Sequence, residues 1–236
     1  MEENPWINLI HSEGNYYLDI DHDNIIQNND DYENDSENEN YVDLRYIPEP
    51  FIGNIEAQIY FLLANPGRTA DNEELELNNL GEHFIDASIN NLNHNLNNYP
   101  FLYLNPDFEH TEGYRWWNRC LNPIITHLNI DRQLFASSFF AIEIYGYHTR
   151  QFNSRFINNN LWLTSIDYTV NLIRNAIHKN KLILISRSVR NWFNLVEDLR
   201  NYQNCYFVAN NRQMEISQYT IPPIVINGIM NRINGA

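Results

Sequence analysis

The feature that most constrains the fold is a regular alternation of short apolar runs with longer amphipathic stretches, beginning near Phe51. The apolar runs are typical of buried strands, and they cover residues 57–64, 139–145, 181–186 and 204–209. The stretches with helical spacing of apolar residues cover 72–96, 114–128, 165–179, 189–200 and 224–233. Such alternation predicts right-handed βαβ units, and therefore an α/β fold with a parallel sheet.

Charge is distributed very unevenly along the 236 residues. Residues 1–50 hold 14 acidic residues and one basic residue (Arg45), so they carry −13 of the net charge of −15. Residues 131–236 hold 6 acidic and 11 basic residues, and a net charge of +5 could attract an anionic ligand. We expect an acidic, partly disordered segment over 1–50, loosely attached at 28–40, followed by one α/β domain over 51–236.

Several classes of protein are disfavoured. No apolar run approaches the roughly 18 residues of a membrane span, and the start of the chain lacks the pattern of a secretion signal. Two distant cysteines exclude a cysteine-bound metal cluster and suit a cytoplasmic location. Asp19–Asp23 resembles the start of a calcium loop but lacks the later glycine and glutamate. We therefore expect no metal and no cofactor.

Polar side chains gather where the four predicted strands end. Asn65 and Arg68 follow the first run, residues 143–149 end the second, Arg187 and Arg190 follow the third, and Asn210 and Arg212 follow the fourth. Ligands of parallel sheets bind outside the carboxyl ends of the strands. The sequence therefore predicts a ligand site at this edge.

The first strand end, Leu63-Ala64-Asn65-Pro66-Gly67, resembles the Asn-Pro-Gly motif of the mismatch-specific and single-strand-selective branches of the uracil-DNA glycosylase superfamily. Leu63 and Ala64 replace the residues that usually precede the motif. The resemblance covers roughly residues 54–220. It implies a four-stranded parallel sheet in the order 2-1-3-4 with helices on both faces, and it gives Asn65 the task of holding the attacking water. Otherwise Asn-Pro-Gly simply forms the turn.

The fourth strand is followed by Asn210-Asn211-Arg212-Gln213-Met214-Glu215-Ile216-Ser217, where the family has its last motif. Here that motif is two residues longer and lacks the Pro-Ser pair. The resemblance makes Asn210 a catalytic residue that stabilises the leaving base. It also places Met214, or Ile216, near the wedge that fills the gap left by the flipped base.

The second strand of the family ends in an asparagine that reads the base, and Glu143 or a residue two further on stands there. A carboxylate accepts hydrogen bonds and favours an exocyclic amine, as in a cytosine-like base. The alternative is a buried ion pair with an arginine such as Arg187. Other candidate base-binding residues are Tyr145, His148 and Phe101, and all of these could instead be structural.

The sequence therefore predicts a monofunctional DNA glycosylase that acts on single- or double-stranded DNA as a monomer. The strand-end arginines, Arg68, Arg187, Arg190 and Arg212, are expected to hold the DNA backbone. The alternative is an inactive protein of the same fold that binds nucleic acid, a nucleotide or a protein, for example in a conflict between phage and host. A third possibility is cleavage of a small nucleoside. The acidic segment could occlude the DNA groove or bind a basic protein.

Overall fold

The computed structural model describes residues 3–67, 81–96, 98–158, 161–209 and 214–235. They form an α/β fold around a five-stranded, mostly parallel sheet. The strands of this sheet are β3 (Phe51–Gly53), β4 (Ile59–Leu62), β5 (Phe139–Ile142), β6 (Leu182–Ile185) and β7 (Cys205–Phe207). A separate antiparallel hairpin consists of β1 (Ile10–Ser12) and β2 (Asn15–Tyr17).

The main sheet has the order β3-β5-β4-β6-β7. Strands β4 to β7 are parallel to one another, whereas β3 pairs antiparallel with β5. The α/β class is therefore confirmed, but the expectation of four strands, all parallel, misses the antiparallel strand β3. Gly53 ends β3 with φ +112°, and a Cβ there would lie 2.5 Å from the carbonyl oxygen of Phe139. A glycine is therefore needed for β3 to lie against β5.

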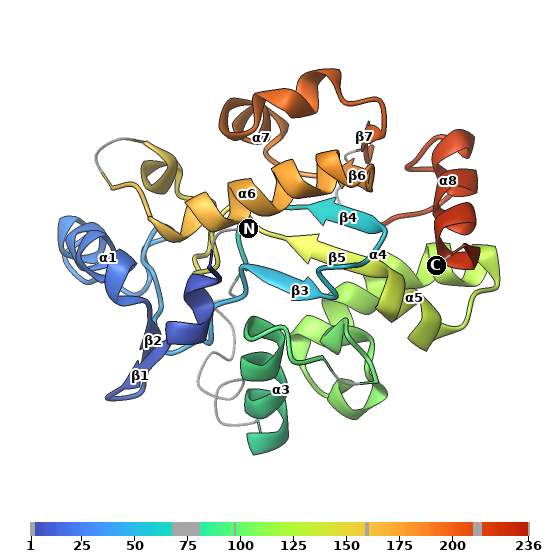
Figure 1. The fold of residues 1–236 in the computed structure, drawn as a ribbon. Coiled ribbons are helices and arrows are strands. Elements are labelled where there is room, and N and C mark those ends of the chain that lie inside the picture. The colour runs from blue at the N-terminus through green and yellow to red at the C-terminus, as the bar shows by residue number, and fades with distance from the viewer. Residues whose placement is uncertain (1–2, 68–80, 97, 159–160, 210–213, 236) are drawn as a thin grey trace.

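Helices cover both faces of the sheet (Figure 1). The helices are α1 (Asp19–Asp31), α3 (Glu82–Leu92), α4 (Glu112–Leu128), α5 (Arg132–Ser138), α6 (Ser165–His178), α7 (Val189–Leu195) and α8 (Pro223–Asn234). Short 3-10 turns are η1 (Pro5–Asn8), η2 (Leu102–Leu104), η3 (Pro106–Phe108), η4 (Ser154–Ile157) and η5 (Glu197–Asn201). The helices predicted at 114–128, 165–179 and 224–233 are confirmed to within two residues at each end. Of the helix predicted over 72–96, residues 72–80 lie outside the described residues, and α3 occupies part of the rest.

Two apolar clusters sandwich the sheet. Alternate strand residues such as Tyr60 and Leu62 face α1, α6 and α7 in the first cluster. Their neighbours Ile59 and Phe61 face α3, α4, α5 and α8 in the second. Both faces of the central strands are therefore buried, which explains why these strands are continuous apolar runs instead of alternating patterns.

The acidic N-terminal segment is folded against the body. Helix α1 and the β1–β2 hairpin lie at the side of the sheet toward which β4 and β5 point (Figure 1). Leu18 and Ile25 enter the first apolar cluster with exposures of 2% and 0%. Asp19 to Asp23 form the first turns of α1 and not a calcium loop, and Asp21 accepts a hydrogen bond from the Ser165 amide.

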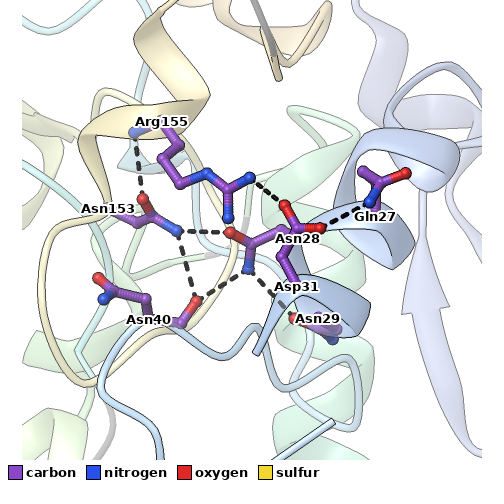
Figure 2. Close-up of polar contacts among 7 residues, drawn as sticks. All are labelled: Gln27, Asn28, Asn29, Asp31, Asn40, Asn153 and Arg155. Atoms are coloured by element: carbon purple, nitrogen blue, oxygen red, sulfur yellow. Dashed lines mark hydrogen bonds and ion pairs between the residues drawn. The ribbon is translucent and has the colours of Figure 1, made fainter. Parts of the chain in front are cut away.

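Residues 28–40, which we expected to be loosely attached, contain a buried set of amides (Figure 2). This asparagine cluster consists of the side chains of Asn28, Asn29 and Asn153 and the backbone carbonyl of Asn40. The Asn153 side chain donates to Asn28 Oδ1 at 2.8 Å, and Asn28 donates to the Asn40 carbonyl at 3.0 Å. Asn29 exchanges two 2.9 Å hydrogen bonds with the backbone of Val42. Amides can be buried because each bonds as both donor and acceptor, and so a polar stretch is held without an apolar pattern.

Candidate functional site at the strand ends

The ends of β4 and β5 remain paired beyond the strands. The Ile144 amide donates to the Ala64 carbonyl at 3.0 Å, and the Thr149 amide donates to the Pro66 carbonyl at 3.4 Å. An isolated parallel bridge also joins Gly67 to Thr149. Asn65 and Glu143, the two residues predicted to act on a base, therefore lie on adjacent strand extensions.

The side-chain amide of Asn65 is held in one orientation. Its Nδ2 donates to Thr149 Oγ1 at 2.8 Å, to the Pro66 carbonyl at 3.1 Å and to the Thr149 carbonyl at 3.3 Å. Carbonyl oxygens only accept, so the NH2 group faces them and the Asn65 side-chain oxygen is turned away from Thr149. That oxygen can orient a water molecule but cannot deprotonate it.

Thr149 connects Asn65 to the asparagine cluster. Its hydroxyl donates to the Gln151 carbonyl at 2.6 Å and lies 3.2 Å from the hydroxyl of Tyr145. Tyr145 in turn accepts from the Asn153 amide at 2.7 Å. Figure 2 shows the far end of this chain, where the Asn153 side chain meets Asn28 and Asn40. The acidic N-terminal segment therefore helps to position the candidate catalytic amide.

Two of the predicted base-binding aromatic residues are core residues. Tyr145 is 1% exposed, and its ring stacks on Phe152 with 5.4 Å between centroids. Phe101 is fully buried and packs edge-on against Trp117 at 4.8 Å. Neither ring has a free face for a ligand, and the predicted stacking role is corrected to apolar packing.

His148 also has a structural setting instead of the predicted contact with a base. Its Nδ1 lies 3.1 Å from the Gly67 carbonyl and its Nε2 lies 3.1 Å from the Ile47 carbonyl. The ring stacks on Tyr46 with centroids 4.9 Å apart. His148 therefore ties the turn after Asn65 to the N-terminal segment.

Glu143 is the buried acid of the site. It is 9% exposed, and its Oε2 is buried with no hydrogen-bond partner among the residues that the structure describes. Burial raises the pKa of this carboxyl well above its ordinary value; the nearby charge of Glu49 adds to the effect, and Arg187 and the Ala64 amide oppose it. The alternative of an ion pair with Arg187 is not found in the described part of the chain.

Glu49 is the acid that sequence reasoning missed. It comes from the N-terminal segment, and Tyr103 on η2 donates its hydroxyl to Glu49 Oε1. Burial raises the pKa of Glu49, whereas His148 and the Tyr103 hydroxyl act in the opposite direction. The sequence feature that could have indicated a buried acid is the position of Glu49, a lone carboxylate between Pro48 and Pro50 in an otherwise apolar stretch.

The remaining predicted residues fall into two groups. Arg187 and Arg190 are exposed beyond β6. Met214, predicted as the wedge, is 9% exposed and belongs to the second apolar cluster, as does its alternative Ile216. Met214 is therefore corrected to a core residue. The others, Arg68, Asn210 and Arg212, lie outside the described residues.

No protein-family model matches the chain, and no curated protein or solved structure does so either. The resemblance to the uracil-DNA glycosylase superfamily therefore consists of the sequence motifs alone, and family membership stays a prediction. Within the described ranges, no helix has both the length and the apolar character needed to cross a membrane.

Proposed function

We propose that this protein hydrolyses the N-glycosidic bond of a nucleobase that has been flipped out of DNA into the strand-end site. The observation that carries the proposal is that Asn65 and Glu143 lie on adjacent, hydrogen-bonded extensions of β4 and β5. One is an amide fixed with its oxygen turned away from Thr149, and the other is a buried carboxyl with an unpaired oxygen. Water orientation and base recognition need these two kinds of group side by side.

The chemistry suits an amide as the water-holding group. When the bond between base and sugar breaks before water attacks, the sugar becomes strongly electrophilic, and a weakly activated water is sufficient. Asn65 then contributes by position, because its NH2 group is fixed by Thr149 and by the Pro66 carbonyl. Glu143 would read a base edge that carries an exocyclic amine, such as that of a cytosine-like base.

The arrangement of the sheet supports the proposal. Its five strands have the order β3-β5-β4-β6-β7, and the parallel strands β4, β5 and β6 are neighbours at its centre. The ends of β4, β5 and β6 deliver Asn65, Glu143 and Arg187 to the edge at which ligands of parallel sheets bind. Arg187 and Arg190 would contact phosphates beside the flipped nucleotide.

The test is to incubate the full chain with single- and double-stranded oligonucleotides that contain uracil, modified cytosines or natural bases, and to detect abasic sites by alkaline cleavage. We expect cleavage of at least one substrate and a loss of about 100-fold or more in Asn65→Ala, by analogy with other transition-state contacts. Asn194→Ala, an exposed change on α7, is the matched control. If no abasic site forms on any substrate, the enzymatic proposal is wrong.

A non-catalytic binding protein is the second candidate. The burial of Tyr145 and Phe101, which were expected to stack on a base, favours it. This candidate predicts that a nucleotide, nucleic acid or protein co-purifies with the chain, and that Asn65→Ala leaves binding unchanged. Free nucleosides in the same cleavage assay test the third possibility, a small substrate. The monomeric state, the cytoplasmic location and a basic partner for the acidic segment stay predictions.

A further inference from the structure

Glu49 and Glu143 are brought together by backbone pairing between the N-terminal segment and the end of β5. The Glu49 amide donates to the Gly146 carbonyl at 2.7 Å, and the Glu143 amide donates to the Pro50 carbonyl at 2.9 Å. At Gly146 a Cβ would come within 2.8 Å of Pro50, so only glycine allows this approach. The two acids form a pair that we call the carboxyl pair.

The groups around the carboxyl pair differ for its two members. Glu49 accepts from Tyr103 and lies near the imidazole of His148, and both favour a charged Glu49. Burial and the nearby charge of Glu49 both raise the pKa of Glu143, whereas Arg187 at the end of β6 lowers it. Its Oε2 lacks a hydrogen-bond partner within the described ranges. One proton held on Glu143 is the arrangement that best fits these surroundings.

A neutral carboxyl with an unpaired oxygen is a proton donor as well as a recognition group. We propose that the carboxyl pair is the general acid of the site: Glu143 donates a proton to an acceptor atom on the leaving base, and Glu49 is a positioning residue that keeps Glu143 protonated. This inference rests on the proposed glycosylase function. It selects bases with a ring nitrogen beside an exocyclic amine, because Glu143 can then donate from one oxygen and accept with the other.

The reaction balances without any further reactant. The bond between the anomeric carbon and the base nitrogen breaks, and its electron pair goes to the base, which takes the proton from Glu143. The oxygen of the water held by Asn65 bonds to the anomeric carbon and loses one proton, which returns to the carboxyl pair. The products are the free base and an abasic sugar hydroxyl, and Glu143 is again protonated.

The first experiment is single-turnover excision as a function of pH, on the best substrate from the oligonucleotide series. Glu143→Gln should reduce the rate by about 100-fold or more, the usual effect of losing a general acid. Glu49→Gln removes the like charge, so the pKa of Glu143 falls and the alkaline limb of the profile should move about one unit toward acid. Glu56→Gln, an exposed acid paired with Lys179 at 2.9 Å, should keep the wild-type profile. The proposal is wrong if the alkaline limb of the pH profile does not move in Glu49→Gln, or if Glu143→Gln keeps full activity.

A second measurement separates this inference from the proposed function. Infrared spectra of the free protein at neutral pH should show the carbonyl band of a protonated carboxyl, and Glu143→Gln should remove that band. Excision without this band overturns the general-acid role and leaves the glycosylase intact. If the carbonyl band is present but no substrate is cleaved, the proposed glycosylase function is wrong, and so is the proton donation to a base. That result would still support a proton held by the carboxyl pair.

Discussion

The asparagine cluster and the carboxyl pair both contact the segment that follows β5, residues 143–153. They differ in how completely their buried polar atoms are hydrogen-bonded. In the asparagine cluster, Asn28 bonds through both its amide nitrogen and its oxygen (Figure 2), and Asn29 does so with the backbone of Val42. In the carboxyl pair, the buried Oε2 of Glu143 has no partner in the described part of the chain. A satisfied polar network stabilises a fold, whereas an unsatisfied buried acid destabilises it and needs a functional reason. The difference is the one expected if the asparagine cluster maintains the structure and the carboxyl pair has the function that we propose for it.

The largest effect is expected from the asparagine cluster. Asn29→Ala leaves the amide and the carbonyl of Val42 without their 2.9 Å partners in a buried place. We expect the free energy of unfolding to fall by about 3 kcal/mol, because each unsatisfied group costs about 1–3 kcal/mol. Urea unfolding measures this change. Asn194→Ala, exposed on α7, is the control and should change little; an equal loss in the control would contradict the structural role of the cluster.

The next effect concerns Thr149, which joins the two regions. Thr149→Val keeps the branched shape but removes the hydroxyl that accepts from Asn65 and donates to Gln151. The Asn65 amide should then lose the shortest of the three hydrogen bonds that fix its orientation, and we expect kcat for excision to fall about tenfold or more with little change in KM. Thr169→Val, a buried change on α6 outside this chain of hydrogen bonds, is the control. A Thr149→Val variant with normal kcat would show that Asn65 is positioned by other means.

Much of the fold follows from the sequence because the central elements have strong local patterns. The four strands predicted at 57–64, 139–145, 181–186 and 204–209 all contain observed strands. Strand β3 was missed because it has three residues, and these follow a proline-rich stretch. Helix α1 was missed because its apolar pattern is weak and its buried asparagines bond to residues distant in sequence.

The candidate site could be predicted only in part. The turn at Asn65-Pro66-Gly67 is local and was recognised, but the contact that orients Asn65 comes from Thr149, 84 positions away. Glu143 was recognised as a buried acid, whereas its neighbour Glu49 belongs to the segment 1–50, which was expected to be partly disordered. Aromatic residues near the strand ends gave a false signal, because local sequence does not distinguish a core ring from a stacking ring.

A smaller effect of opposite sign is expected at Glu143. Because its pKa is raised in the folded protein, its contribution to stability is complete below the unfolded pKa near 4.5 and is lost as pH rises through the folded pKa. Glu143→Gln should therefore be more stable than the wild type at pH 8, and its stability should depend less on pH. Urea unfolding at pH 5 and pH 8 tests this, with Glu56→Gln as control. A variant that is less stable at pH 8 would place Glu143 among the structural groups.

The smallest effect is expected at the rim of the asparagine cluster, where Asp31 pairs with Arg155 and accepts from Gln27 at 2.7 Å (Figure 2). Both partners of the ion pair are about one-third exposed, at 37% and 34%, and water and salt weaken such pairs. The hydrogen bond from Arg155 lowers the pKa of Asp31, so any stability from it is lost only as pH falls through the acid range. Asp31→Asn should leave the midpoint of thermal unfolding at pH 7 unchanged within error. Asn29→Ala, measured in the same way, should lower that midpoint strongly. Equal destabilisation of the two variants would contradict this explanation. It would show that the buried, fully bonded Asn29 contributes no more to stability than the exposed pair of Asp31 and Arg155.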